Sequence, residues 1–221
     1  MNTYFLSGLG ADERAFQRLT FPEEVRVVHI KWPQPDQKEA LVDYCTKIAS
    51  IIDKTTDFSI IGFSFGGIVM IELLKTLKPK NSILLSSVGS RQEMPGVLKF
   101  LGKTGVARLL PRSALNKVYP FAHLFTGLKN EEDKKIWAAI MRDSDPYFLK
   151  WAIQEILTWK NEKRPENIFH IHGSKDLTFP VDLVKADRII AGGGHFMVLS
   201  HADQISRIIN EQLGYASRTI I

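Results

Sequence analysis

The sequence has little cysteine and no long apolar run. Its 221 residues include one cysteine, Cys45, so no disulfide can form within the chain. Cys45 shares helical spacing with three apolar residues and is therefore predicted to be a small buried side chain rather than a nucleophile; the three are Leu41, Ile48 and Ile52. The longest uncharged run, residues 58–71, is interrupted by glycines and is too short to cross a bilayer, so no membrane span is expected.

The start of the sequence lacks a basic leader and a long apolar segment. The residues MNTYFLSG enter a strand pattern at once, so a secretory signal is not expected and the cytoplasm is the expected location. Repeats, low-complexity tracts and linker-like stretches are also lacking. Residues 1–221 are therefore predicted to form one domain.

Acidic residues are scarce in one segment. The chain has a formal net charge of +5, and only Glu93 is acidic in a segment that contains seven basic residues: Arg91, Lys99, Lys103, Arg108, Arg112, Lys117 and Lys129. The segment lacks a recognised motif with interleaved stacking aromatics, so nucleic-acid binding is not predicted. The charges are either solvated surface groups or a positive field that favours an anionic substrate or one delivered on an acidic carrier protein.

Short β-branched and aromatic runs alternate with longer helical patterns along most of the chain. The runs predict strands at residues 3–8, 25–30, 58–63, 82–87, 168–173 and 187–192. The longer patterns predict helices at residues 12–19, 38–54, 66–78, 146–161 and 198–213. Several strand runs are almost continuously apolar, as in strands covered on both faces. The order predicts an α/β fold with a mainly parallel sheet of about six strands and helices on both faces.

One interval, residues 90–145, interrupts the alternation. It has no strand pattern, and prolines and glycines divide its helical patterns. It is long for a connection and rich in apolar residues, so we expect a helical cap inserted over one edge of the sheet. The apolar residues that suggest a cap are Val97, Leu98, Leu101, Leu109, Leu110, Phe121 and Phe125.

A serine stands at the sharpest break in the apolar pattern. The segment GFSFGG, residues 62–67, places Ser64 between glycines, directly after a predicted strand and before a predicted helix. A tight strand-to-helix turn would strain the backbone of Ser64 and expose its hydroxyl, and side chains at 62 and 66 would collide with neighbouring backbone. Ser64 is therefore a candidate nucleophile; the alternative is a helix N-cap in a glycine-rich turn.

Two further polar residues follow later predicted strands. Asp176 follows the fifth strand in HGSKD, and His195 follows the sixth in AGGGHF. Each is common in loops, but the carboxyl ends of parallel strands meet at one edge of a sheet. A serine nucleophile needs a base, and that base needs a carboxylate to orient it. The order Ser64, Asp176, His195 therefore predicts a catalytic triad.

The other polar candidates are weaker. His29, His170 and His172 lie within predicted strands and are expected to be packed or hydrogen-bonded. His123 lies in the insertion and His201 in the last helix pattern, and no clustered ligand spacing is present, so neither a metal nor another cofactor is expected.

The first loop, SGLGADERAF, is a candidate oxyanion-binding element. An oxyanion on the substrate needs two preorganised N–H donors, and we expect these from the backbone of Phe65 and Leu9. Glycines at 8 and 10 would let the loop approach the substrate. Asp12 is predicted to be a helix N-cap rather than a catalytic acid.

These motifs resemble the α/β-hydrolase family over nearly the whole chain. GFSFGG, HGSKD, GGGHF and the SGLG loop occur in family order. The resemblance implies a Ser64–His195–Asp176 triad, a two-amide oxyanion hole and a cap after the fourth strand. Many members have His-Gly where this chain has Ser7-Gly8. Many also begin with two more strands, which this chain lacks, so its sheet is predicted to be all parallel. Dehalogenases and epoxide hydrolases of this family would need a carboxylate at position 64, so Ser64 argues against both.

The leading hypothesis is a serine hydrolase that cleaves a carboxylic ester or thioester of a small, partly apolar acyl group through an acyl-enzyme. The alternative is a small-ligand binding protein on the same fold. Trp137 and Trp151 either line the ligand pocket or pack in the core of their helices.

Overall fold

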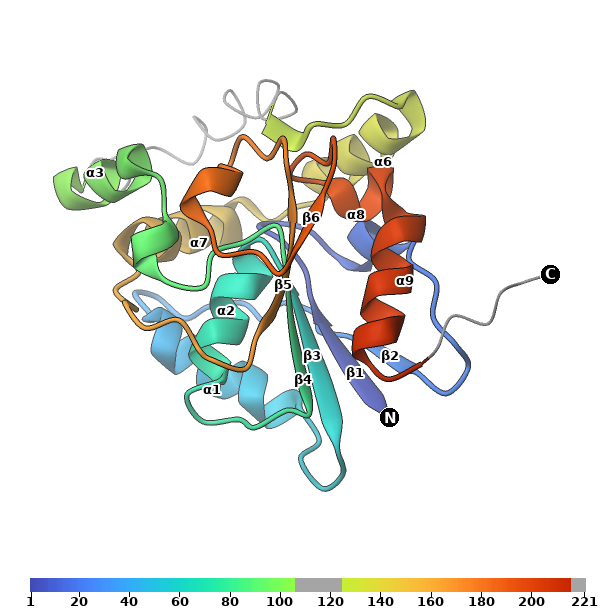
Figure 1. The fold of residues 1–221 in the computed structure, drawn as a ribbon. Helices are drawn as coiled ribbons and strands as arrows, with labels where there is room; N and C mark the ends of the chain where they lie inside the picture. Colours follow the sequence, from blue (N-terminus) through green and yellow to red (C-terminus); the bar gives the residue numbers. More distant parts are fainter. Residues whose placement is uncertain (106–124, 216–221) are drawn as a thin grey trace.

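A six-stranded parallel sheet forms the centre of the molecule (Figure 1). The computed structural model describes residues 1–105 and 125–215. The sheet order is β2-β1-β3-β4-β5-β6, and every adjacent pair is parallel. This confirms the predicted α/β fold and the all-parallel sheet. The strands are β1 (Asn2–Leu6), β2 (Arg26–His29), β3 (Phe58–Phe63), β4 (Asn81–Leu85), β5 (Phe169–Gly173) and β6 (Arg188–Ile190).

The strand order reverses direction between β1 and β3. The chain moves outward from β1 to β2, returns to β3 on the other side of β1, and then proceeds to β6. Loops that follow β1 and β3 therefore leave in opposite directions at the carboxyl edge, which is where ligands bind in open α/β sheets. The registers Leu6↔Gly62 and Phe63↔Leu85 bring the residues after β1, β3 and β4 to that edge.

Helices cover both faces of the sheet (Figure 1). The apolar core on one face includes residues from three helices: α1 (Leu41–Ile51), α2 (Phe65–Leu73) and α7 (Pro146–Thr158). The core on the other face includes residues from η1 (Glu13–Phe16), α6 (Glu131–Arg142), α8 (Met197–Ser200) and α9 (Ala202–Gln212). Successive residues of β3 alternate between the cores, because side chains of a strand point to opposite faces: Ile60 lies in the first and Ile61 in the second.

The central helix α2 has no solvent-facing side. All nine of its residues are buried, including Glu72, whose carboxylate accepts a hydrogen bond from the Trp159 indole at 2.8 Å and pairs with Lys75 at 2.7 Å. Cys45 packs in the same core at 5% exposure, which confirms the predicted buried side chain. Burial raises the pKa of its thiol, which disfavours the reactive thiolate.

The helical predictions differ from the structure in extent, and the predicted helices 66–78 and 146–161 end earlier, at Leu73 and Thr158. The predicted helix 198–213 is divided into α8 and α9 at His201, whose φ of −130° is not helical. The predicted helix 12–19 is the single 3₁₀ turn η1, whose N-cap Asp12 accepts a hydrogen bond from the Arg14 amide, as predicted. The predicted helix 38–54 is the shorter α1. Apolar periodicity identifies the buried face of a helix but does not show where a single residue interrupts that helix.

The described part of the 90–145 interval contains the helical elements η2 (Arg91–Glu93), α3 (Gly96–Thr104) and α6. A further 3₁₀ turn, η3 (Val181–Leu183), lies between β5 and β6. Helix α6 contributes Trp137 and Ile140 to the second core. Trp151 of α7 is buried and donates to the Glu39 carbonyl at 2.7 Å, so both tryptophans have core positions. Leu109, Leu110 and Phe121 lie outside the described residues, and the cap remains a prediction. No helix in the described ranges has the length and apolarity needed to cross a membrane.

Candidate active site

Ser64 lies at the strained turn between β3 and α2. Its φ of 53° and ψ of −116° are rare for a residue with a side chain and cost about 1–3 kcal/mol. Hydrogen bonds hold the turn: the Ser64 amide donates to the Leu85 carbonyl at 3.0 Å, and the Ser64 carbonyl accepts from the Gly67 amide at 3.0 Å and the Ser87 hydroxyl at 2.7 Å. Surrounding structure therefore maintains a conformation that Ser64 would not adopt alone.

The glycines around Ser64 are required by close backbone contacts. A Cβ at Gly62 would lie 2.7 Å from the Gly66 carbonyl oxygen, and a Cβ at Gly66 would collide with the carbonyl oxygens of Leu6 and Ser7. The predicted backbone collisions are thereby confirmed. The close approach of α2 to β1 places the start of the helix directly against the first loop.

The structure brings Ser64, His195 and Asp176 together. The Ser64 Oγ lies 2.8 Å from His195 Nε2, and His195 Nδ1 lies 2.8 Å from Asp176 Oδ2. An ionised carboxylate only accepts hydrogen bonds, so His195 Nδ1 carries a proton and the neutral ring presents a bare Nε2 to the serine. This geometry allows His195 to accept a proton from Ser64.

Asp176 is held as a carboxylate by its surroundings. Its other oxygen, Oδ1, accepts hydrogen bonds from the amides of Thr178 at 2.8 Å and Phe179 at 2.9 Å. Burial by itself raises the pKa of Asp176, but charge attraction and hydrogen bonding from His195, together with the Phe179 amide, outweigh burial and lower it. Asp176 therefore stays ionised at neutral pH.

The backbone amides of Leu9 and Phe65 are available as donors. Neither amide donates a hydrogen bond to another residue within the described ranges. The first loop passes next to the serine, since a Cβ at Gly8 would lie 3.4 Å from the Ser64 Cβ. This arrangement is compatible with the predicted oxyanion hole, in which both amides would point at the developing charge.

Side chains on both sides stabilise the first loop. The Ser7 hydroxyl donates to the Ala11 carbonyl within the loop. The Ser144 hydroxyl, between α6 and α7, donates to the Gly10 carbonyl at 2.6 Å. Arg14 extends the contact by pairing with Asp143 at 2.9 Å. The sequence motifs did not point to Ser144, because it contacts the loop from 134 positions away.

A second contact joins residues 126 and 127, at the start of the segment that ends at Ser144, to the loop that carries His195. The Phe196 amide donates to the Thr126 carbonyl at 2.9 Å. A Cβ at Gly194 would lie only 2.6 Å from the Gly127 Cα, so the two backbones touch. Segment 126–144, which contains α6, therefore contacts the His195 loop near one end and the first loop at the other.

Comparisons with known proteins identify the family of the chain. A sequence model of the α/β-hydrolase family matches residues 4–208. The chain belongs to the α/β-hydrolase family. Among curated proteins, no sequence matches it.

Solved structures share the fold of this α/β hydrolase at low sequence identity. The esterase EaEST from Exiguobacterium antarcticum is 17% identical with a TM-score of 0.68, covering 97% of this chain and 92% of its own. MenH from S. aureus is 18% identical with a TM-score of 0.69, covering 97% and 93%. A hydrolase from Pseudomonas aeruginosa PA01 is 13% identical with a TM-score of 0.73, covering 96% and 89%. These likenesses show the fold, which hosts many reactions.

Two further histidines of this α/β hydrolase lie behind Asp176. His170 and His172 on β5 are fully buried and contact each other at 3.0 Å, which confirms that they are packed and hydrogen-bonded. Burial, together with nearby His172 and Arg164, lowers the pKa of His170 to about 3. Burial also lowers the pKa of His172. In the described residues, no three His, Cys, Asp or Glu side chains are grouped to hold a metal ion.

The buried histidines make stability depend on pH. Below the ordinary histidine pKa of 6.5, His170 binds a proton in the unfolded chain but stays neutral in the folded protein. The free energy of unfolding therefore decreases as pH falls from 6.5 toward 3. We expect a loss of about 1.4 kcal/mol per pH unit for each histidine that stays neutral. Urea unfolding from about pH 7 to pH 4.5 measures it.

The variant His170→Gln is the control for this prediction. It lacks the titrating group, so its unfolding free energy should depend on pH less steeply by about one proton. Asp176 does not account for the same loss, because its stabilising contribution is present above its ordinary value of 3.8 and disappears only at lower pH. A flat wild-type profile, or equal slopes in both proteins, would contradict the prediction.

Proposed function

We propose that this α/β hydrolase is a serine hydrolase that cleaves a carboxylic ester or thioester through an acyl-enzyme. The observation that carries the proposal is the continuous pair of 2.8 Å contacts from Ser64 through His195 to Asp176, at a strained turn that aims the serine hydroxyl. Packing of a core does not require such an arrangement, whereas nucleophilic catalysis by a serine does.

In the proposed reaction His195 Nε2 takes the proton of Ser64 as its Oγ attacks the substrate carbonyl. The negative charge that develops on the carbonyl oxygen is stabilised by the amides of Leu9 and Phe65, and the imidazolium by Asp176. Protonated His195 then gives its proton to the leaving alcohol or thiol, leaving the acyl group on Ser64. A water molecule, deprotonated by His195, attacks the acyl-enzyme and releases the acid.

The proposed substrate is a small molecule with a partly apolar acyl group. The Exiguobacterium protein that shares this fold is an esterase, which favours an ester over other bonds. An anionic or carrier-bound substrate remains a prediction from the basic segment. Arg91 in that segment donates to the carbonyls of Leu157 and Trp159, so it is engaged in the fold. Arg108, Arg112 and Lys117 lie outside the described residues.

A fluorophosphonate probe tests the proposal against the alternative of a ligand-binding protein. The probe reacts with a serine whose hydroxyl is activated by a base, so we expect one adduct, located on the Ser64 peptide by mass spectrometry. Heat-unfolded protein is the control and should not react. A panel of aryl esters and acyl thioesters of graded chain length then identifies the preferred acyl group. Absence of both labelling and turnover would favour the binding protein.

A further inference from the structure

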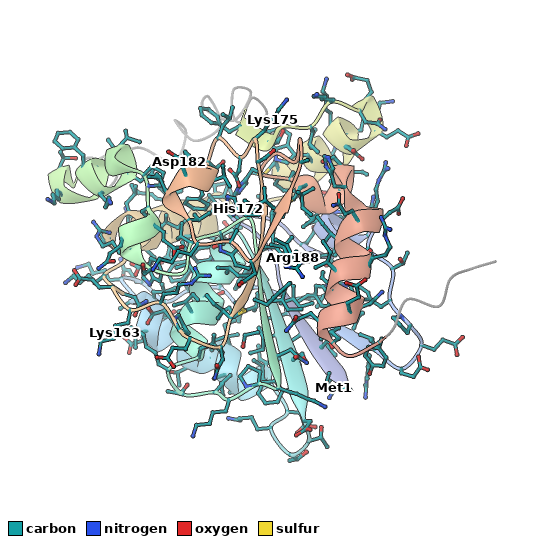
Figure 2. All side chains as sticks on the ribbon, viewed as in Figure 1. Met1, Lys163, His172, Lys175, Asp182 and Arg188 are labelled. Carbon is teal, nitrogen blue, oxygen red and sulfur yellow. The ribbon has the colours of Figure 1, made fainter. Side chains whose placement is uncertain are left out.

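His170 and His172 are buried titratable groups that the proposed reaction does not use. They occupy alternate positions of β5 and so point to the same side of the sheet, and both are 0% exposed. Figure 2 shows His172 in the interior of the molecule, away from the outward-pointing Lys175. Two imidazoles in a core are costly unless hydrogen bonds satisfy them. Their partners therefore indicate what they do.

The hydrogen bonds fix which nitrogen of His172 carries the proton. His172 Nε2 lies 2.7 Å from the Phe179 carbonyl oxygen, which can only accept, so Nε2 is protonated. In neutral His172 the other nitrogen, Nδ1, is then bare and accepts from His170 Nε2 at 3.0 Å. His170 therefore stabilises the ring form of His172 whose N–H points at Phe179.

The remaining nitrogen of the pair, His170 Nδ1, donates no hydrogen bond in this assignment. Neutral His170 has no proton left for Nδ1, which lies 3.2 Å from the Lys185 carbonyl, the longest of the three contacts. That carbonyl is already satisfied by Arg164, which donates to it at 2.6 Å. The lowered pKa values of both histidines keep the pair neutral.

His172 also contacts the turn that holds Asp176. The amides of Thr178 and Phe179 bind Asp176 Oδ1, and the Phe179 carbonyl is anchored to His172. His172 Nε2 lies 3.5 Å from Asp176 Oδ2, the oxygen that binds His195. The carboxylate is thus held by the backbone amides of a turn that is itself anchored to an imidazole fixed in β5.

We propose that His172 is a positioning residue: its Nε2–H, set by His170, anchors the Asp176–Phe179 turn and directs Asp176 Oδ2 at His195. The inference rests on the proposed function for its kinetic consequences but not for the hydrogen bond itself. The charged or titratable groups around the pair are Asp176, His195, Glu93 and Arg164. Glu93 and Arg164 are paired with each other at 2.9 Å.

The matched variants His172→Phe and His170→Phe test the role. Both replace a fully buried histidine of β5 by a ring of similar size, but only His172 contacts the Asp176 turn. With an aryl ester, we expect His172→Phe to lower kcat by about 10- to 100-fold with KM little changed, because a misplaced carboxylate orients the base poorly. The loss in His170→Phe should be smaller, and the double variant no worse than His172→Phe.

The pH profile separates positioning from mere packing. In His172→Phe the carboxylate loses a nearby N–H and attracts the proton on His195 more strongly, so the acid limb of kcat/KM should move to higher pH. His172→Gln retains a side-chain N–H and should recover part of kcat. Equal losses in His170→Phe and His172→Phe, with an unmoved acid limb, would show a packing role and overturn the proposal.

Nuclear magnetic resonance measures the protonation of His172 directly, even if a variant fails to fold or the enzyme catalyses another reaction. Long-range proton–nitrogen spectra of the wild-type protein at neutral pH should show His172 protonated at Nε2 and bare at Nδ1. The opposite ring form would overturn the proposal. The His195 Nδ1–H resonance should shift in His172→Phe without any turnover. Absence of esterase activity with that shift present would sink the proposed function but not the positioning role.

Discussion

Replacing Ser64 by alanine is expected to abolish ester hydrolysis while leaving the fold intact. The Ser64 Oγ is the only atom removed, and it is the atom 2.8 Å from His195 Nε2. Loss of a serine nucleophile lowers kcat by about 10⁴- to 10⁶-fold in hydrolases of this type. Alanine keeps the same strained backbone, so the free energy of unfolding should change by less than about 1 kcal/mol. Initial rates with an aryl ester and urea unfolding measure both effects.

The control for Ser64→Ala is Ser50→Ala. Ser50 is an exposed serine of α1 whose hydroxyl donates to the Lys47 carbonyl rather than to a triad residue. It should retain wild-type activity and probe labelling. Substantial hydrolysis by Ser64→Ala protein that is free of wild-type enzyme would show that another group is the nucleophile.

Replacing Asp176 by asparagine is expected to lower kcat by about 10⁴-fold, as in the serine proteases where this change was made. An amide in place of the carboxylate can present an N–H to His195 Nδ1 and so favours a ring protonated at Nε2. That ring cannot accept the Ser64 proton. The asparagine oxygen can still accept from the amides of Thr178 and Phe179, so the turn is retained. Steady-state kinetics with the same ester measure the loss.

Two other aspartates near the sheet edge make the test of Asp176 specific. Asp187 accepts a hydrogen bond from the His170 amide at 2.7 Å, and Asp182 lies in η3. Their asparagine variants should keep most of the activity, because neither carboxylate contacts His195. A mild effect of Asp176→Asn beside a severe effect of either control would assign the acid elsewhere.

The sequence predicted those features that depend on local pattern. The bounds of β3 are those predicted, because its run of apolar residues is followed by a glycine-rich break. The prediction for β4 extended to residue 87, but the strand ends at Leu85 because Ser86 adopts a φ of 43° that no local pattern indicates. Local patterns therefore found each strand but not the backbone strain that ends one.

Contacts between distant segments could not be predicted in the same way. The order of Ser64, Asp176 and His195 pointed to one edge of the sheet because parallel strands end together. Nothing comparable marks Ser144, whose contact with Gly10 depends on how α6 packs. Nor did any local pattern show that Trp137 and Ile140 of α6 join the core on the second face of the sheet.

The contacts of segment 126–144 have a consequence for how this enzyme could diversify. The interval between β4 and α7 is a natural place for substitutions that change substrate preference, since loops tolerate change better than a core. Thr126, Gly127 and Ser144, however, touch the loops that carry His195 and the first-loop amides. A recombinant that exchanges residues 96–124 with those of a relative keeps these contacts, whereas an exchange of 96–144 replaces them. The segment that can be exchanged without disturbing these contacts is thus shorter than the interval 90–145, because residues 126–144 contact the first loop and the loop that carries His195.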